Sequence, residues 1–597
     1  MSASEPYPFV ILRLARRRRT GHVSVRRQRG VTAILAAVCI GMAIAALGVI
    51  DIGNYYFARR ELQRTADLAA SAAAQTISNG GDCTSATTSA QNNAVNGNGL
   101  SNSSATVTVV CGRWDPTVNA GQSYFATTGT PMNAAQVTVS EIVPYFFVGP
   151  AREIQAVATA EATNIRSFSL TSAVASLSGG LLNGLLNGLL PGANLNLSVA
   201  SYQGLATTQI KLGDLATALG VGSMSQLLGT QVSLSKLVTA MITAAGKSTT
   251  LGATAITDLG TIEAAIPGGL NVALGNSATT NGLLAVALDD PQAAVNATVN
   301  VLDTLLAAAE IANGTSAINL GTALNLGALA NVTAQAKIIQ PPVIAVGEAG
   351  QNADGTWRTS AHSAEVQVYL NVNLLNLSVG LPGVPSLVSI DALNLPIYIE
   401  AGYGTAYVQS TECTTQHASS QSTIVATTGI ANLCIGGDAS KNFTNTITAT
   451  SCNMPAKLTT VNALGMSVIK VSVGSSSPAS GLNLNLQAAS TPLVFNGVPN
   501  SSDAYQSTNT NGVGAATAGL LTQLAAGMSS SIYATVGHAN VSVAAAPLLT
   551  AIVGLLSPIL TSLDALLVPL LQLLGVQIGV STVHDLGLAC GQAQLVY

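Results

Sequence analysis

Cysteine and histidine are the residues of this chain whose types could do chemistry, as metal ligands or as a nucleophile and its base. The chain has seven cysteines and five histidines. One group suits zinc by residue type and consists of Cys413, His417, Cys434 and Cys452. The Cys-x-x-Cys pairs of common zinc sites do not occur, and disulfides account for the same cysteines. We therefore predict no metal site and keep zinc as the alternative.

Arrangements typical of catalysis are missing from the sequence. His584-Asp585 are adjacent, and such a pair alone is more typical of a surface contact than of a base and its orienting carboxylate. Asp289-Asp290 is explained by capping of a helix that Pro291 opens. Gly246-Lys247-Ser248 resembles the end of a phosphate loop, but Met241 stands where the first glycine is required. We predict no catalytic residues, no cofactor and no enzyme activity.

Disulfide bonds are the chemistry that the cysteines favour. Cys39 lies inside a long apolar run, and the six cysteines outside it are Cys83, Cys111, Cys413, Cys434, Cys452 and Cys590. An even number suits an oxidising compartment, where each disulfide stabilises a domain by about 2–4 kcal/mol. Cys83 and Cys111 are candidates to close one small module, whereas the pairing of the other four stays open.

The compartment in which these cysteines lie is indicated by twenty consecutive apolar residues, Val31 to Ile50. At about 1.5 Å per residue the run covers about 30 Å, the thickness of the hydrocarbon core of a lipid bilayer. Eight arginines precede the run and three follow it closely, so the positive-inside rule predicts a cytoplasmic leader and an exported remainder. The alternative is a signal peptide cut near Ala45, which would release a secreted or surface-exposed adhesin.

The predicted exported part is acidic. The first thirty residues contain eight arginines and one glutamate, which leaves 14 basic and 25 acidic residues, a net charge of −11, for the rest of the chain. We therefore predict that nucleic acid is not a partner. The lipid bilayer is the first partner that we predict.

Small residues recur at every fourth position of the apolar run, at Ala33, Ala37, Gly41 and Ala45. Such a stripe lets the backbones of two membrane helices approach closely, which predicts helix packing and a homo-oligomer; the alternative is that alanine is simply abundant. Apolar residues at helical spacing continue to Ile77 and end before Gly80-Gly81, so we predict one helix from Val31 to Ser78.

Several motifs follow one another along this segment. They are Arg26–Gly30, Asp51-Ile52-Gly53, Arg59–Gln63, Ala66–Ala69, and then Asn133–Phe147 and Thr159–Ala162. Together they resemble TadE/TadG-like proteins of tight-adherence (Flp) pilus systems over about the first 165 residues. The resemblance implies an anchored structural component whose partners are other pilus-assembly or envelope proteins. We hypothesise that Asp51 and Asp67 seat it against basic groups of neighbouring subunits.

The resemblance does not extend to a von Willebrand A domain, which many TadG-like proteins carry. The metal site of that domain needs Asp-x-Ser-x-Ser, and no aspartate of this chain opens that motif. Metal-dependent adhesion through such a domain is therefore not expected.

Periodicity predicts an α+β fold. Alternating apolar residues predict strands within 105–165 and 365–410. One helix is predicted over Ala293–Ala312, with Asp290 as its N-cap and Gly314 beyond its end, and another ends at Gly246. Three eleven-residue repeats that start with proline fill 547–579, and each predicts a short apolar helix. They suit a buried core, a partner-binding or interfacial surface, or a second membrane span.

These patterns divide the chain into seven predicted segments. They are a basic cytoplasmic leader (1–30), a transmembrane helix (31–53), a helical extension (54–80), a small β-rich TadG-like module (81–165), a low-complexity Leu/Asn/Gly/Ala-rich α/β region (166–345), a β-rich region (346–542) and the proline/leucine repeats with the tail (543–597).

Overall fold

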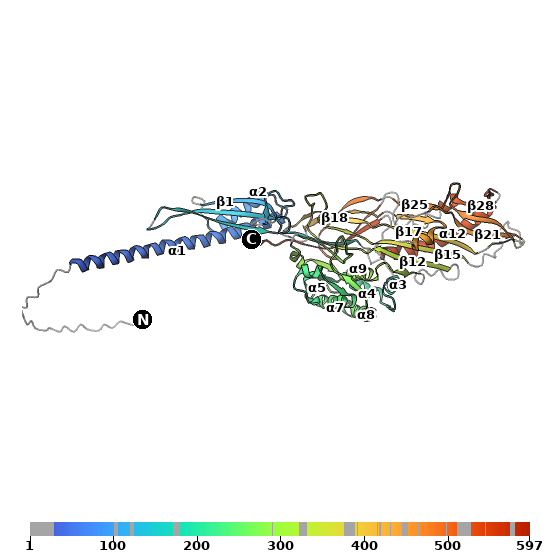
Figure 1. Ribbon diagram of the computed structural model, residues 1–597, viewed down its shortest axis with the longest axis horizontal. Coiled ribbons are helices and arrows are strands. Elements are labelled where there is room, and N and C mark those ends of the chain that lie inside the picture. Colours follow the sequence, from blue (N-terminus) through green and yellow to red (C-terminus); the bar gives the residue numbers. More distant parts are fainter. Residues whose placement is uncertain are drawn as a thin grey trace, which may run out of the picture. The chain divides into compact units, whose positions relative to one another are not determined.

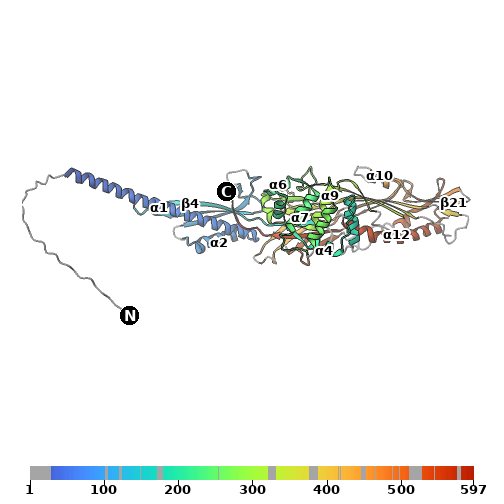
Figure 2. The same cartoon turned by 90° about the horizontal axis from the view of Figure 1, so that it is seen from below.

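The computed structural model describes residues 29–596 apart from 101–104, 120–123, 148, 171–178, 253, 289, 321–330, 375–387, 391, 415, 417–418, 430, 445–451, 464–465, 487, 497, 510–526, 544 and 574–579. The predicted leader thus lies almost wholly outside the described residues. The chain forms two units, one of Met1–Leu62 with Ser140–Gln155 and one of Gln63–Val139 with Ala156–Tyr597. Figures 1 and 2 show the elements of both in two views.

The first unit is built on helix α1 (Arg29–Ser78), which also continues into the second unit. The prediction of one uninterrupted helix through Asp51 to Ser78 is confirmed. The unit also contains the adjoining ends of two strands, β3 (Ala134–Val143) and β4 (Arg152–Glu161), with the turn that joins them.

The second unit begins with a five-stranded sheet in the order β2-β1-β3-β4-β31. Its further members are β1 (Ala105–Trp114), β2 (Phe125–Ala126) and β31 (Gln594–Val596). Helix α2 (Cys83–Asn92) and a π-helical turn (Asn93–Gly97) lie in the connection between α1 and β1. The strands predicted within 105–165 are therefore present, and a strand from more than 400 residues later extends the sheet.

Seven α-helices with short strands between them occupy the described part of residues 179–313. The helices are α3 (Gly179–Leu189), α4 (Val199–Thr207), α5 (Leu212–Leu219), α6 (Met224–Leu228), α7 (Leu234–Ala245), α8 (Ala255–Ala265) and α9 (Val301–Asn313). The strands pair antiparallel as β6 (Gln209–Lys211) with β10 (Thr298–Asn300) and β7 (Gln231–Ser233) with β8 (Asn271–Ala273). The helix predicted to end at Gly246 is α7, which Gly246 caps.

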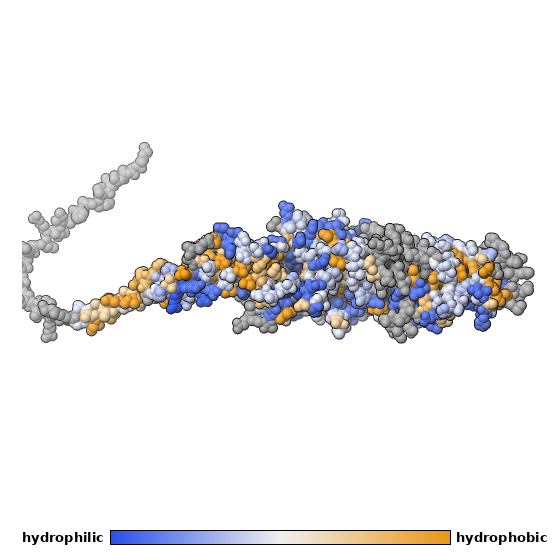
Figure 3. Space-filling model, turned by 90° about the horizontal axis from the view of Figure 1, so that it is seen from above, coloured by the Kyte–Doolittle hydropathy of each residue, from blue (hydrophilic) through white to orange (hydrophobic). Residues whose placement is uncertain are grey.

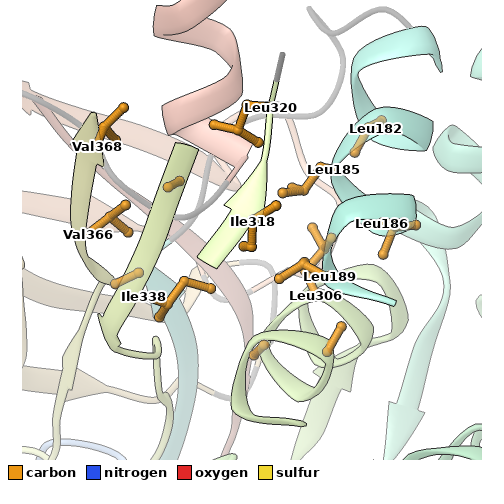
Figure 4. Close-up of a cluster of buried hydrophobic side chains, with 14 of the residues drawn as sticks. Leu182, Leu185, Leu186, Leu189, Leu306, Ile318, Leu320, Ile338, Val366 and Val368 are labelled. Atoms are coloured by element: carbon orange, nitrogen blue, oxygen red, sulfur yellow. The ribbon is translucent and has the colours of Figure 1, made fainter. Parts of the chain in front are cut away.

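The repeat LLNGLLNGLL forms most of α3, and its leucines, glycines and asparagines make different kinds of contact. Five of its leucines are buried in the main hydrophobic core, namely Leu182, Leu185, Leu186, Leu189 and Leu190. Figure 4 shows Leu185 and Leu189 beside Ile318. Glycine is needed at position 188, because a β-carbon there would lie 2.6 Å from Ile318 Cγ2. The low sequence complexity of α3 therefore encodes a specific packing arrangement.

The asparagines of the same repeat bind an extended segment of the chain. Asn183 donates to the carbonyl of Leu197 and accepts from its N–H, both at 2.9 Å. Asn187 does the same for Leu195, at 3.0 and 2.7 Å. Four helical residues advance about 6 Å and two extended residues about 6.6 Å, so the i, i+4 spacing on α3 matches the i, i+2 spacing of the segment.

Four larger sheets make up most of the rest. One has the order β27 (Tyr505–Asn509), β30 (Val580–Ala589), β5 (Ile165–Leu170), β13 (Ile344–Gly347) and β9 (Leu284–Ala287), in which only β13 and β9 are parallel. A second has the order β11 (Ala317–Asn319), β12 (Asn331–Gln340), β15 (Glu365–Leu374), β17 (Leu393–Ala401), β20 (Ala431–Ile435) and β25 (Leu482–Leu486). The strands predicted within 365–410 are thus found, and the predicted α+β class is confirmed.

The two remaining large sheets are antiparallel. One has the order β14 (Ser360–His362), β18 (Thr405–Glu412), β19 (Gln421–Thr427) and β26 (Ser490–Phe495). The other has the order β16 (Val388–Ile390), β21 (Ala456–Ala463), β22 (Met466–Val473), β28 (Ile532–Val536) and β29 (Ala539–Asn540). A small hairpin of β23 (Ser475–Ser476) and β24 (Ala479–Ser480) and helix α10 (Ala439–Thr444) complete this part.

The single helix predicted over Ala293–Ala312 is wrong, because the chain breaks it in two. Asp290 caps only a 3₁₀ helix, Pro291–Asn296. Residues 298–300 then form β10, and Asn300 caps α9 by accepting from the N–H groups of Leu302 and Asp303. The strand pairing with β6 lies outside the local sequence, which is why the local pattern did not reveal the break.

The prediction of separate short helices in the proline repeats is also wrong. One helix, α12 (Ala546–Leu573), runs through Pro558 and Pro569, and residues 574–579 of the third repeat lie outside the described residues. Leu548, Ile552 and Leu556 lie four residues apart on α12 and are buried in the main core. Burial of this continuous apolar face offsets the backbone hydrogen bonds that proline removes. The described first half of α12 thus follows the buried-core alternative.

Candidate functional site

The apolar first half of α1 is the first part of the candidate site. Among the described residues, α1 is the one helix that is long and apolar enough to cross a membrane by length and composition. Apart from Leu47 and Gly48, which are half-buried, the residues of Val31–Ile50 are exposed, as with Ile34 at 67% and Val49 at 68%. A helix from the core of a soluble domain would have one of its faces buried. Figure 3 shows the apolar surface of this helix in orange.

The small residues predicted for helix packing lie within this exposed segment. They are Ala33, Ala37, Gly41 and Ala45, and all four are exposed. The positions of Gly41 and Gly53 are open, with no other part of the chain within 4 Å of where a β-carbon would lie. The stripe is therefore free to contact another helix, and its role stays a prediction.

Asp51 ends the apolar run and binds the hairpin turn between β3 and β4. Its Oδ1 accepts from the N–H of Phe146 at 2.8 Å, and its Oδ2 accepts from the N–H of Phe147 at 3.1 Å. The Asp51 side chain is almost fully buried, with 2% exposed. Asp51 thus has partners in its own chain, 95 residues later, and its predicted contact with a neighbouring subunit stays a prediction.

The second half of α1 packs through alanines. Ala66, Ala69, Ala70, Ala73 and Ala74 are fully buried in the second unit. Side chains as small as alanine allow close approach of a helix to a sheet. Asp67 is half-buried and accepts from Gln63 Nε2 at 2.7 Å, and the same amide donates to the carbonyl of Val157 on β4. The predicted contact of Asp67 with a neighbouring subunit stays a prediction.

A disulfide between Cys83 and Cys111 joins the start of α2 to β1. Asp82 caps α2 by accepting from the N–H of Ser85 at 2.8 Å. Ser89 on α2 donates to the carbonyl of Ala72 on α1 at 3.3 Å. The end of α1, α2 and the sheet thus form one closed module.

Two family models match this N-terminal part of the chain. One is described as Flp pilus-assembly TadE/G-like and covers residues 30–76. The other is described as Tad-like Flp pilus-assembly and covers residues 72–162. Residues 30–162 thus match models of the TadE/TadG-like family. The resemblance read from the motifs is thereby confirmed, and we call residues 30–162 the Tad region.

The Tad region is followed by a segment that matches another family model, described as a domain of unknown function (DUF8293), over residues 178–310. This range corresponds to helices α3 to α9. No curated protein and no solved structure matches the chain. Tad families are structural, so the Tad region gives no support to enzyme activity.

Strand β31 completes the sheet of the Tad region from outside it. Residues Gln594, Leu595 and Val596 pair antiparallel with β4. Gln75 on α1 holds the same tail, since its Nε2 donates to the carbonyl of Gly591 at 3.0 Å and its Oε1 accepts from the N–H of Ala593 at 3.2 Å. Sequence reasoning missed this pairing, because three residues carry too short an alternation to indicate a strand.

A buried ion network also ties the Tad region to the rest of the second unit. Arg113 on β1 donates to Glu348 Oε2 and to the carbonyl of Pro131, both at 3.0 Å. Arg358 Nε lies 2.9 Å from Glu348 Oε1. Arg113 is 4% exposed and Glu348 5% exposed, so removal of either partner would leave a buried charge uncompensated. No local motif indicates this network, because Arg113 and Glu348 lie 235 residues apart in the sequence.

The surface pair predicted for His584-Asp585 is wrong, because both residues are fully buried. His584 Nδ1 lies 2.7 Å from Asp303 Oδ2, which also accepts from Ser169 at 2.6 Å. Asp585 lies 2.5 Å from Arg166. Burial lowers the pKa of Arg166 and raises the pKa of Asp585, and each charge opposes the effect on the other.

This polar cluster joins β5, β30 and α9 within the protein interior. The ring of Tyr505 stacks on His584 with a centroid distance of 4.0 Å, which closes the cluster further. A serine, a histidine and an aspartate meet here, but Ser169 and His584 both bind the aspartate instead of each other. A serine nucleophile needs the histidine to accept its hydroxyl proton, with the aspartate on the other side of the histidine. In this cluster of described residues, Ser169 and His584 are not arranged in that way.

The zinc alternative is wrong for the cysteines, because disulfides occupy their sulfur atoms. Cys413 pairs with Cys590, and Cys434 pairs with Cys452. His417 lies outside the described residues. Within the described ranges, no three His, Cys, Asp or Glu side chains gather as a metal site would require. Cys39 is the free cysteine of this part of the chain.

Proposed function

We propose that this protein is a single-pass, membrane-anchored component of a Tad/Flp-type pilus assembly or secretion system. It resides in the bacterial inner membrane with a cytoplasmic N-terminus and a periplasmic bulk. Its role in biogenesis and adhesion is structural. The observation that carries this proposal is the match of the Tad region, whose first residues are the exposed apolar half of α1.

The charge distribution supports the proposed orientation. Arginines are concentrated before the span, and positively charged flanks stay in the cytoplasm. The disulfides support it as well, since six cysteines form three bonds in the part that is proposed to be exported. A protein with this topology presents its large β-rich part to pilus or envelope partners.

The orientation is tested by labelling from one side of the membrane. Val118 is 76% exposed, so a Val118→Cys variant offers a reactive thiol beyond the span. In intact spheroplasts, a membrane-impermeant maleimide should label this variant and leave Cys39 unlabelled. Labelling of Val118→Cys only after lysis would refute the orientation. Mass spectrometry of the mature N-terminus tests the anchor, because a start near Ala46 would indicate the released adhesin instead.

Self-association through the small stripe is tested by disulfide trapping. At 100° per residue, Cys39 lies on the face opposite Ala37 and Gly41. An Ala37→Cys variant in a Cys39→Ser background should form cross-linked dimers in membranes, and the natural Cys39 should not. Equal cross-linking at both positions would refute packing through the stripe. Co-purification of other pilus components with the full chain tests the proposed partners.

A further inference from the structure

Aromatic side chains gather in the first unit where the apolar run ends. They come from α1 and from the hairpin turn and are Tyr55, Tyr56, Phe57, Tyr145, Phe146 and Phe147. Four of them are largely exposed: Phe57 at 69%, Tyr56 at 65%, Phe146 at 62% and Phe147 at 54%. Aromatic residues are only 4% of the chain, so six within two short segments are a marked concentration.

Asp51 fixes the height of the hairpin turn along α1. Because its two carboxylate oxygens accept from the N–H groups of Phe146 and Phe147, these residues lie level with the end of the apolar run. One helical turn earlier, on the same face as Asp51, Leu47 and Gly48 are half-buried, whereas the rest of Val31–Ile50 is exposed. The turn is therefore held beside the last turn of the apolar run.

The exposed apolar residues at this level surround the helix. Val49, Ile50 and Ile52 are exposed at 52–68% on the faces away from Asp51. Phe146 and Phe147 cover the face that Asp51 occupies. A protein partner would bind one side of such a structure, whereas a bilayer contacts every side at one depth. Aromatic rings are enriched at this depth, where the hydrocarbon core meets the headgroups.

We propose that the turn between β3 and β4 is a second membrane contact, with Phe146 and Phe147 seated at the boundary between acyl chains and headgroups in the leaflet from which α1 emerges. The inference rests on the proposed membrane anchor. The lipid surface is the occupant, because the exposed aromatic residues lie at the level where the exposed apolar run of α1 ends. The carboxylate of Asp51 satisfies two backbone N–H groups that would otherwise lie unpaired at the edge of the hydrocarbon.

A second contact changes what the anchor does. A single helix is free to rotate about its own axis and to tilt in the bilayer. With the turn seated beside it in the interface, one face of α1 is fixed toward the hairpin. The depth and rotation of the helix are then set, and the start of the exported part takes one orientation relative to the membrane plane.

Spin-label accessibility tests the proposal on the full chain in nanodiscs of phosphatidylcholine and phosphatidylglycerol. A label at Phe147→Cys, in a Cys39→Ser background, is compared with a label at Val118→Cys, which is exposed in the second unit. Oxygen collects in lipid and a nickel chelate stays in water. We expect the label at 147 to be relaxed more by oxygen than by nickel and the label at 118 to show the reverse ratio.

A label on the natural Cys39 separates the two proposals. If Cys39 is reached by nickel, the membrane anchor itself fails. If Cys39 is in lipid while the label at 147 is relaxed mainly by nickel, the anchor stands and the second contact is refuted. A label at 147 that both reagents fail to reach, with dipolar broadening between copies, would indicate a second copy as the occupant and also refute the lipid contact. Adding Asp51→Ala should shift the ratio at 147 toward nickel.

Discussion

The asparagines of the low-complexity segment allow a sharp test, because identical residues have unequal partners. Asn183 is 8% exposed and makes three hydrogen bonds: two with the backbone of Leu197 and one that it accepts from Tyr202 at 2.7 Å. Asn187 is half-buried and makes two, both with Leu195. Asn196 is exposed. Replacing each with alanine should therefore destabilise the segment to three different extents.

The expected sizes follow from these bonds. A typical hydrogen bond contributes about 1 kcal/mol net, so Asn183→Ala should cost about 3 kcal/mol and Asn187→Ala about 1–2 kcal/mol. Asn196→Ala should stay within about 0.5 kcal/mol, as surface substitutions do. Because 1.4 kcal/mol is a factor of ten, about 3 kcal/mol corresponds to exchange faster by about two orders of magnitude.

Hydrogen exchange measured by mass spectrometry on the full chain provides the readout. Asn183→Ala should speed exchange at the N–H of Leu197, and Asn187→Ala should speed it at the N–H of Leu195, because each amide loses its acceptor. Asn196→Ala is the matched control. Equal effects of Asn183→Ala and Asn196→Ala would refute the conclusion that the asparagines of α3 hold the segment at Leu195 and Leu197.

Three further predictions concern charged groups. Asp51→Ala should loosen the hairpin turn by about 3 kcal/mol, since charged hydrogen bonds are worth about 1.5–3 kcal/mol each, and faster exchange at the N–H groups of Phe146 and Phe147 measures it. Burial, together with the negative charges of Asp290 and Glu348, raises the pKa of Glu161 to about 7. The folded protein therefore holds this proton more tightly than the unfolded chain, and its stability should fall as the pH rises from about 4.5 to 7. Glu161→Gln should remove up to about 3 kcal/mol of this fall, which would appear as a smaller difference in Tm between pH 4.5 and pH 8. Arg166→Met should cost about 3–5 kcal/mol by leaving Asp585 unpaired, and adding Asp585→Leu should restore most of it in thermal unfolding.

Each of these has an outcome that contradicts it. Asp51→Asn keeps one acceptor oxygen, so an effect as large as that of Asp51→Ala would argue against the two hydrogen bonds. A Tm of the natural protein that rises from pH 4.5 to pH 8, unaltered by Glu161→Gln, would argue against a neutral buried carboxyl. A double variant at 166 and 585 less stable than Arg166→Met alone would show that the ion pair is not the source of the cost.

The sequence predicted features that depend on neighbours within a few turns. The apolar run and the alanine spacing predicted α1, and alternation at Val366, Val368 and Leu370 predicted β15, because burial of one face imposes a local period. The candidate membrane span and the family motifs were read from the same kind of local pattern. The capping signal at Asp290 was also real, but it started a shorter element than predicted.

Long-range pairings could not be predicted, because no local pattern reports them. His584 is buried and contacts Asp303, which lies 281 residues earlier. Nothing next to His584 in the sequence distinguishes it from a surface residue. Asp51 shows the same limit at the candidate site. Its position at the end of the apolar run marked it as notable, but its partners on the hairpin turn are visible only in three dimensions.

The late strand β31 has a consequence for how the molecule is made. It pairs with β4 only after residues 162–593, which separate the two, have been synthesised. Until then one border of that sheet presents unsatisfied backbone groups, which is the geometry that invites mispairing with other chains. Pairing by β31 therefore links completion of an early-emerging sheet to the synthesis of residues 594–596, so that a chain interrupted before them keeps an unpaired edge at β4, far from the interruption.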